Sequence, residues 1–419
     1  KINVAGTLDA SGKEAGRIEL FANNNVNVQA TAQLKATSSG ANEDGGDIVI
    51  GTRDGQLDLE ASDPGKGIDV SGGAGGQGGT VLLRAPRSNS DTDVAVNALD
   101  TRISGARSVT VEAVKVYDYA GDKTLTSGDL VTIKDDNAAF AGHLDAGGNY
   151  VDHYAAIKDR LQQPAIHVLS GVEVHAAGDL TLASDWNLST ARAGGEAGVL
   201  TLAADGNLSI NSNLSDGFSH ATPCTTATCN ASNPSPSTVL ADESWSYRLV
   251  AGSDAGAANP LAVVRNANGG NVTLAAGKLI RTGTGDIQVR AGGNIALADN
   301  KSAIYSAGRA SPAIAGFTPP ADAQFSQGGG DVSLAALGDI ASPNRSKQLY
   351  SNWLFRQGKL DSNGTAYETD LQPAWWVRFD QFQQGVGALG GGDVSLVAGG
   401  KVENASASTP TQARMASAT

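Results

Sequence analysis

Two similar stretches decide the fold: GDLTLASDWNLST at residues 178–190 and GVLTLAADGNLSI at residues 198–210. Aligned with a shift of 20 residues, they share nine identical residues in thirteen positions. Similarity at a fixed spacing is typical of repeat proteins, in which each unit packs only against its neighbours. The pair therefore predicts a chain of stacked units of about 20 residues.

The same unit recurs along nearly the whole chain. Clear copies are GNVTLAAGKLI from Gly270, GDVSLAALGDI from Gly330 and GDVSLVAGGKV from Gly392. Weaker copies begin at Gly16, Gly46, Gly79 and Gly285.

One unit shows how it folds. In GDVSL, Val332 and Leu334 point to one side and Ser333 to the other, which is the alternation of a half-buried strand. The Gly-Asp or Gly-Asn pair before each strand tolerates a positive φ, and we expect the Asp or Asn side chain to bond its own backbone in a tight corner. Each unit is thus strand, corner, strand, corner.

Strands this short cannot bury an apolar face alone, but stacked coils can, with a rise of about 4.8 Å per coil. The sequence therefore predicts an all-β parallel β-helix, a solenoid with loop and short helical insertions. The competing architectures are antiparallel propellers and sandwiches. These need tight Asn-Gly hairpins and a steady period near 40, which the sequence lacks.

Composition narrows the function. The chain has 419 residues and 53 Gly, and only 5% of its residues are aromatic, which suits a narrow core of small aliphatic side chains. It holds 43 acidic and 30 basic residues, for a net charge of −13, so we expect no nucleic-acid partner. The sequence contains no run of 18 apolar residues, so we expect no helix that spans a membrane. Because the chain starts at Lys1 and its one methionine is Met415, we expect it to be cut from a longer precursor.

Four stretches interrupt the repeat, and binding sites of solenoids often lie on such insertions. The first contains YVDHYAAIKDRLQQ, whose apolar spacing predicts a short helix, and the second is a polar loop with two cysteines. The expected segments are coils at 1–133, an insertion with a short helix at 134–165, coils at 166–210, the polar loop at 211–262, coils at 263–308, a loop at 309–328, a coil at 329–342, an aromatic-rich insertion at 343–390, a coil at 391–404 and a tail at 405–419.

The fourth interruption concentrates the aromatic residues of a chain otherwise poor in them. Its stretch WWVRFDQFQQGVGALGGGDVSLVAGGKVEN, beginning at Trp375, resembles a region near the carboxyl end of filamentous-haemagglutinin-like exoproteins. The GDVxLxAGG units upstream resemble the shaft repeats of the same proteins. These repeats cover most of the chain but are shared by many exoproteins, whereas the aromatic stretch is more specific and covers about a tenth.

This resemblance implies a right-handed β-helix that is secreted to the bacterial cell surface. It also implies two-partner secretion through an outer-membrane transporter barrel, and a role in attachment, aggregation or biofilm. The family supplies no catalytic residues to transfer. We therefore expect a non-catalytic adhesin or matrix-fibre segment whose partner is a surface glycan, polysaccharide or cell-surface receptor. The alternatives are a β-helical polysaccharide lyase or hydrolase and a passive shaft that presents another binding domain.

The aromatic insertion is the candidate binding site. Its aromatic faces could stack on sugar rings or a partner protein while the flanking charges bond hydroxyl groups. The alternative, which we favour, is that the aromatic residues pin a long loop onto the shaft. The residues concerned are Trp353, Trp375, Trp376, Arg378, Phe379 and Asp380.

Other chemistry has weaker support. Cleavage of a polysaccharide needs paired acids, or an acid beside a base, and the candidates are Asp135 with Asp136 and Asp118 with Lys115. We expect the two adjacent acids to lie in a solvated turn. The five histidines show no metal-binding spacing, and no metal or cofactor is expected. Cys224 and Cys229 are close enough in sequence for a disulfide, and the alternative is two unpaired thiols in a loop.

Overall fold

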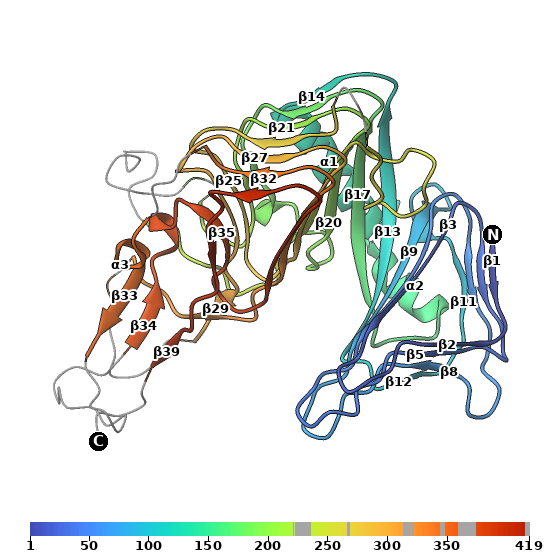
Figure 1. Ribbon diagram of the computed structural model, residues 1–419. Coiled ribbons are helices and arrows are strands. Elements are labelled where there is room, and N and C mark those ends of the chain that lie inside the picture. The colour runs from blue at the N-terminus through green and yellow to red at the C-terminus, as the bar shows by residue number, and fades with distance from the viewer. Residues whose placement is uncertain are drawn as a thin grey trace.

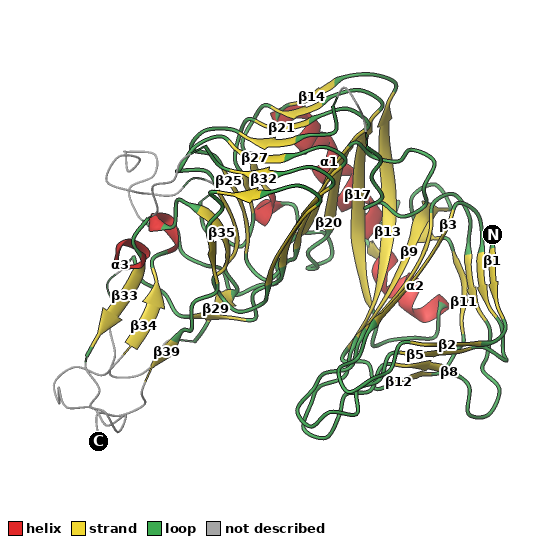
Figure 2. Ribbon diagram, in the orientation of Figure 1, coloured by secondary structure: helices red, strands yellow, loops and turns green. Residues whose placement is uncertain are grey.

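The chain folds as a parallel β-helix, as its sequence predicts (Figures 1 and 2). The structure is a computed structural model. It describes residues 1–220, 222, 236–265, 269–312, 320, 322–343, 348–358 and 374–414.

One parallel sheet, called here the long sheet, runs through the whole molecule. Its strands in spatial order are β3 (Arg17–Ala22), β6 (Asp47–Thr52), β9 (Thr80–Ser88), β13 (Ser108–Tyr119), β17 (His167–Ala176), β20 (Val199–Ala204), β23 (Ser246–Ala251), β26 (Ile287–Ala291), β31 (Val332–Ala336) and β36 (Val394–Ala398). The short strand β10 (Asp93–Val94) pairs antiparallel with β9. Every turn of the chain thus returns to this one sheet.

Two further sheets complete the coils before β13, and this part is called the N-terminal leg. One holds β1 (Ile2–Val4), β4 (Val26–Val28), β7 (Leu57–Leu59) and β11 (Val96–Leu99). The other holds β2 (Thr7–Asp9), β5 (Gln33–Lys35), β8 (Gly67–Asp69) and β12 (Ile103–Ser104).

Two different sheets complete the coils after β13, and this part is the C-terminal leg. One holds β14 (Lys123–Leu125), β18 (Leu180–Leu182), β21 (Leu208–Ile210), β24 (Val272–Leu274), β27 (Ile295–Leu297), β32 (Ile340–Ala341) and β37 (Val402–Glu403). The other holds β19 (Trp186–Asn187), β22 (Leu214–Ser215), β25 (Leu279–Thr282), β28 (Ala303–Ser306), β35 (Gly385–Ala388) and β38 (Ala407–Ser408). Each leg has its own apolar core.

The legs meet at β13 and β17, which are the longest strands of the long sheet, with 12 and 10 residues. The preceding strand β9 pairs with the first half of β13, at Ser108–Val114. The following strand β20 pairs with the second half of β17, at Gly171–Ala176. The coils are therefore displaced along the strands where the legs meet, and the legs splay apart in a V (Figure 1).

Core side chains alternate along each strand. Val172 and Val174 of β17 are 1% exposed and lie beside Leu200 and Leu202 of β20 in register. Burying a side chain of this size stabilises the fold by about 1.5–3 kcal/mol. The stacked core thus makes each coil depend on its neighbours.

The repeat length differs from the prediction. Leu180 pairs in register with Leu208, and Leu200 pairs with Val172, so one coil here spans 28 residues instead of about 20. The two similar stretches lie in different sheets: Leu180 belongs to β18, whereas Leu200 belongs to the long sheet. They are alike because both strands of a coil follow the same local rule of glycine, polar corner and alternating strand. The shift of 20 residues is therefore the distance along the chain from β18 to β20, and not the length of one coil.

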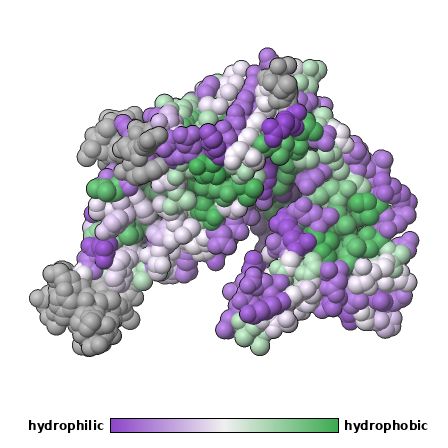
Figure 3. All heavy atoms as spheres, viewed as in Figure 1, coloured by the Kyte–Doolittle hydropathy of each residue, from purple (hydrophilic) through white to green (hydrophobic). Residues whose placement is uncertain are grey.

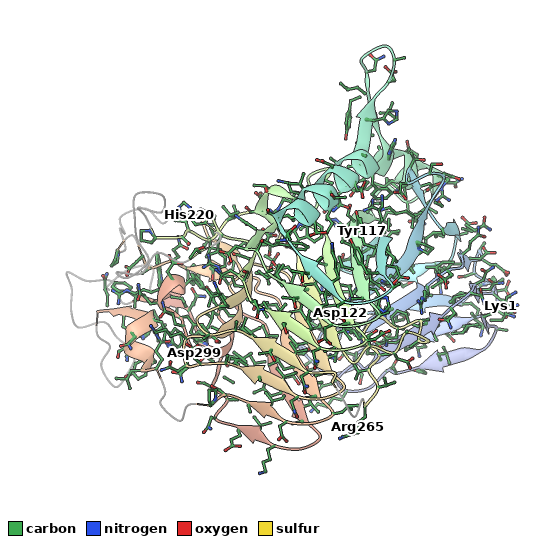
Figure 4. The ribbon with its side chains drawn as sticks, turned by 90° about the horizontal axis from the view of Figure 1, so that it is seen from above. Lys1, Tyr117, Asp122, His220, Arg265 and Asp299 are labelled. Atoms are coloured by element: carbon green, nitrogen blue, oxygen red, sulfur yellow. The ribbon has the colours of Figure 1, made fainter. Side chains whose placement is uncertain are left out.

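The corner side chains also bond differently from our expectation. Each Asp or Asn before the strands of the β14–β37 sheet accepts a hydrogen bond from the backbone N–H of the equivalent residue in the next coil, not from its own corner. The Oδ1 acceptors are Asp122, Asp179, Asn207, Asn271, Asn294 and Asp339, and the donors to them are Asp179, Asn207, Asn271, Asn294, Asp339 and Lys401, at 2.7–3.1 Å. This column is called the Asx ladder, and Figure 4 labels its first residue, Asp122.

The ladder explains the glycine of each Gly-Asx pair. A Cβ at Gly338 would collide with Oδ1 of Asn294, the side chain that caps the next residue, Asp339. The same collision with the ladder oxygen of the coil before would occur at Gly178, Gly206, Gly293 and Gly400. Glycine is needed there because two coils approach closely, and not mainly because of its φ.

Helices occur mostly at the first interruption. Helix α1 (Ser127–Ala141) begins before the expected boundary at 134, and Asp129 accepts from the N–H of Thr126 at its start (2.7 Å). The hairpin β15 (Gly142–Leu144) and β16 (Tyr150–Asp152) follows, and then α2 (His153–Arg160), at the position of the expected short helix. Figure 4 shows α1 close to Tyr117 and the hairpin projecting beyond it.

The remaining interruptions contain more strand than the sequence pattern indicates. The expected loop 211–262 includes β22 and β23, which lack a Gly-Asx start, and the short helix η1 (Leu188–Thr190) precedes it. The expected loop 309–328 includes an antiparallel pair, β29 (Arg309–Ala310) and β30 (Ser326–Gln327). The aromatic insertion contains α3 (Tyr350–Trp353), β33 (Leu354–Gln357), β34 (Ala374–Val377), η2 (Phe379–Gln381) and the coil strand β35, and β34 pairs with β39 (Ala413–Arg414) of the expected tail.

Candidate functional site

The outer face of the long sheet lies between the two legs and forms a cleft. This face carries the side chains that alternate with the core residues, and Figure 3 shows the hollow between the legs. The cleft has a volume of about 470 Å³, which is within the range of ligand pockets. Its charged lining residues are Arg17, Asp47, Arg107, Arg248, Asp286 and Asp331.

Arg248 of this cleft belongs to a network of four charges, three of which are buried. Arg248 of β23 donates two hydrogen bonds to Glu112 of β13, at 2.7 and 2.9 Å. Arg84 of β9 contacts Glu112 at 3.3 Å and also donates to Glu173 of β17. Arg84, Glu112 and Arg248 are 9% exposed or less. Two arginines and two glutamates therefore balance each other in a site shielded from water.

This network requires a bent sheet. Arg248 lies three strands beyond Glu112, a separation of about 14 Å if the sheet were flat. Glu112 leans across β17 at Gly171, where a Cβ would lie 2.8 Å from Cγ of Glu112. The absence of a side chain at Gly171 thus lets the two charges meet across the sheet.

The two sides of the network shift each other's pKa. Burial alone would raise the pKa of Glu112, but Arg248 and Arg84 hold it below its usual value. Burial would lower the pKa of Arg248, but Glu112 raises it. Both groups are therefore charged at neutral pH.

Among the carboxylates that line the cleft, Asp286 has the most strongly shifted pKa. It lies at the corner before β26, and its Oδ1 accepts from the N–H of Asp331 (2.9 Å). Loss of hydration in the cleft raises the pKa of Asp286 to about 6, and the nearby carboxylates of Asp331 and Asp47 act in the same direction. Arg17 of the opposite leg opposes this shift. The side chain of Asp286 nevertheless remains exposed to solvent.

A second pocket, of about 270 Å³, lies beyond the buried network. His175 lines it and contacts two carboxylates, Asp118 through Nδ1 (2.6 Å) and Asp205 through Nε2 (2.9 Å). Burial would lower the pKa of His175, but the two carboxylates raise it above 6.5. Since both acceptors are carboxylates, this arrangement favours the protonated ring, in which both ring nitrogens donate.

The loop after β23 covers this pocket and joins the legs. Asn23 and Arg53 of the N-terminal leg donate to the backbone oxygens of Gly256 and Ala255, with a distance of 3.0 Å for the first bond. The two legs are therefore connected both at β13 and β17, where they meet, and through this loop.

The predicted aromatic site is mostly packed inside the protein. Trp353 and Trp376 are each 6% exposed, and Phe379 is 1% exposed. Asp380 is also buried and pairs with Arg281 (3.3 Å), whose guanidinium lies 3.9 Å from the ring centre of Phe218. Of the residues predicted to bind, Trp375 and Arg378 are the two that are partly exposed, and Arg378 pairs with Asp322 (3.0 Å). The geometry resembles an anchor on the coils more than an open stacking surface.

The predicted catalytic pairs do not come together as pairs. Lys115 contacts Asp91 (2.7 Å) and Asp136 (3.0 Å), whereas Asp118, on the other face of β13, contacts His175. Asp135 and Asp136 lie on α1 and not in the solvated turn that we expected.

Two of the five histidines lie close together: Nδ1 of His143 is 3.0 Å from Nε2 of His153. Within the described residues, no cluster of three or more His, Cys, Asp or Glu side chains could hold a metal ion. Cys224 and Cys229 lie outside the residues that the structure describes.

The cleft was not predicted from the sequence, although four strands carry an unusual charged residue. Arg84, Glu112, Glu173 and Arg248 each interrupt an apolar strand at its centre, in TVLLRAP, VTVEAV, GVEVHA and SYRLVA. A charge in the middle of a strand is costly when both faces of the strand are covered, unless the charge is paired. Four such charges of opposite sign indicate a shared network, but not which strands bring them together.

Comparisons with known proteins give no family assignment. No protein-family model, no curated protein sequence and no solved structure matches the chain. Among the described residues, the helices are too short or too polar to cross a bilayer.

Proposed function

We propose that the chain is a segment of a secreted bacterial adhesin or biofilm-matrix fibre that attaches to a surface glycan, polysaccharide or receptor. The proposal combines the β-helix with the resemblance of the WWVRFD stretch to filamentous-haemagglutinin-like exoproteins. From that resemblance, export would use an outer-membrane transporter barrel, and the chain would reach the cell surface.

The cleft is the observation that carries a binding role. A passive shaft needs only coils that stack, whereas this chain displaces its coils at β13 and β17 and encloses a polar hollow of about 470 Å³. The buried network at Glu112 costs desolvation energy and is a weak source of net stability. The cleft and its buried network therefore support a binding surface better than they support a passive shaft.

A polysaccharide-cleaving enzyme is the second candidate, and Asp286 favours it. A carboxyl group that titrates near neutrality in a cleft suits a general acid. Non-catalytic binding has better support because Asp47, a carboxylate that could act beside Asp286, is held by Thr80 (2.6 Å) and by Arg17 (3.5 Å).

Attachment of coated particles tests the proposal. Beads that carry the purified chain should adhere under flow to bacterial cells or to immobilised cell-surface polysaccharide, and albumin-coated beads should not. Equal retention of both kinds of bead would refute the adhesive role. Release of reducing ends or unsaturated sugars from the same polysaccharide would establish the enzyme instead.

A further inference from the structure

The arginines that line the cleft are already paired. Arg17 pairs with Glu19 (2.7 Å) and Asp47 (3.5 Å), Arg107 pairs with Asp44 (3.3 Å), and Arg248 pairs with Glu112. The lining itself contains three arginines and three aspartates, in a protein with a net charge of −13. An acidic ligand would have to compete with these carboxylates for each guanidinium. The cleft is therefore not selective for a polyanion.

Unpaired polar groups lie on the C-terminal wall of the cleft. In the part of the chain that the structure describes, neither the side-chain amide of Gln288 nor Oδ2 of Asp286 has a hydrogen-bond partner. The two residues are two positions apart and line the same cleft. Together they offer two N–H donors, a carbonyl acceptor and a carboxylate acceptor at the surface of one strand.

The other side of the cleft adds hydroxyl groups and apolar surface. Thr80 and Thr110 line it from β9 and β13 of the N-terminal side. Leu82 and Leu169 lie between the two walls and are partly exposed. The cleft thus alternates groups that bond hydroxyls with groups that pack against C–H surfaces.

We propose that this cleft binds a neutral, hydroxyl-rich glycan, with Gln288 and Asp286 bonding its hydroxyl groups and Leu82 and Leu169 contacting its C–H faces. A neutral sugar chain displays both kinds of surface and leaves the existing ion pairs intact. An extended peptide would instead seek unpaired backbone groups of a sheet edge, and the long sheet presents its face here. The inference names the partner class of the adhesive function and rests on it.

Glycan binding by purified variants tests the assignment. The full chain is applied to an array of neutral gluco-, manno- and galacto-hexasaccharides and oligogalacturonate of equal length, and the best ligand is titrated calorimetrically. Gln288→Leu should weaken binding about tenfold, because it removes the hydrogen bonds of the amide at nearly constant volume. Asp286→Asn should alter affinity without loss of folding, since the amide oxygen can still accept from Asp331. The matched control is Gln29→Leu, at a partly buried glutamine after β4 on the far side of the N-terminal leg.

Each outcome decides a separate point. Equal affinity of Gln288→Leu and Gln29→Leu would show that the glycan binds elsewhere. Tighter binding of oligogalacturonate, preference for a peptide, or no binding of any neutral member would overturn the ligand class. Bead attachment without neutral-glycan binding would leave the adhesive function standing and remove this inference. Neutral-glycan binding without bead attachment would leave this inference standing and remove the adhesive function.

Discussion

Arg248 and Glu112 form a two-bond ion pair, at 2.7 and 2.9 Å, although three strand steps of one sheet separate them. The pair fixes how the two legs meet, because it can form only where the outer face of the long sheet is concave. The cleft and the buried network are therefore two consequences of one displacement of the coils.

Glu112→Gln should destabilise the protein strongly. The substitution removes the negative charge that pairs with the buried Arg248 and Arg84. Breaking a buried ion pair costs about 3–5 kcal/mol. The free energy of unfolding from denaturant titration measures the loss. The matched control Glu19→Gln removes an exposed partner of Arg17 and should cost less than about 1 kcal/mol. Similar losses for both variants would contradict a structural role for the network.

Gly171→Ala should act through Glu112. The new Cβ would lie 2.8 Å from Cγ of Glu112, and such overpacking costs about 1–3 kcal/mol. Gly121→Ala, at a site with open space, is the control. In a Glu112→Ala background the penalty at Gly171 should shrink only in part, since Cγ2 of Val114 would still lie 2.9 Å from the new Cβ. An unchanged penalty in that background would place the strain at Val114 and not at Glu112.

The Asx ladder predicts coupling between neighbouring coils. Gly338→Ala drives a Cβ into Oδ1 of Asn294, and Asn294→Ala removes the acceptor of the Asp339 N–H. Loss of that acceptor should cost about 0.5–1.5 kcal/mol. Combined, the two substitutions should cost less than the sum of their separate losses in free energy of unfolding, because the second removes the atom that the first strikes. Additive losses would show that the ladder oxygen does not set the need for glycine.

The sequence predicted the stacked architecture because each strand carries its own signal, as in the alternation of Val332, Ser333 and Leu334. The coil length was wrong because Leu180 and Leu200 obey the same local rule in different sheets. The ladder was missed for a related reason: a Gly-Asx pair looks like a turn within one coil, whereas its hydrogen bond crosses to the next. The cleft depends on register between β9, β13 and β20, and register between distant strands is not a local property of any of them.

His175 should make stability depend on pH in one direction. Its pKa is raised in the folded protein by Asp118 and Asp205, so its contribution is fully present below the unfolded value of 6.5 and is lost as the pH rises through the raised pKa. Asp205→Asn should lower the pKa of His175 toward 6.5, which NMR titration of the imidazole C–H signals measures directly. In His175→Gln, the loss of stability across that window should become smaller. A fall in the pKa below 6.5 in the native protein would mean that burial outweighs both carboxylates.

Arg281→Met should release the aromatic insertion before it unfolds the coils. Arg281 is fully buried and contacts Asp380, Ser215 and Tyr305, so its loss removes the buried ion pair with Asp380, at a cost of about 3–5 kcal/mol. Because Trp353 and Trp376 pack in this region, their fluorescence should change at lower denaturant than the far-ultraviolet circular dichroism of the coils. Arg309→Met, which removes an exposed pair with Glu243, should leave the two transitions together. If Arg281→Met shifts both signals equally, the insertion and the coils form one cooperative unit, and the ion pair stabilises the whole stack.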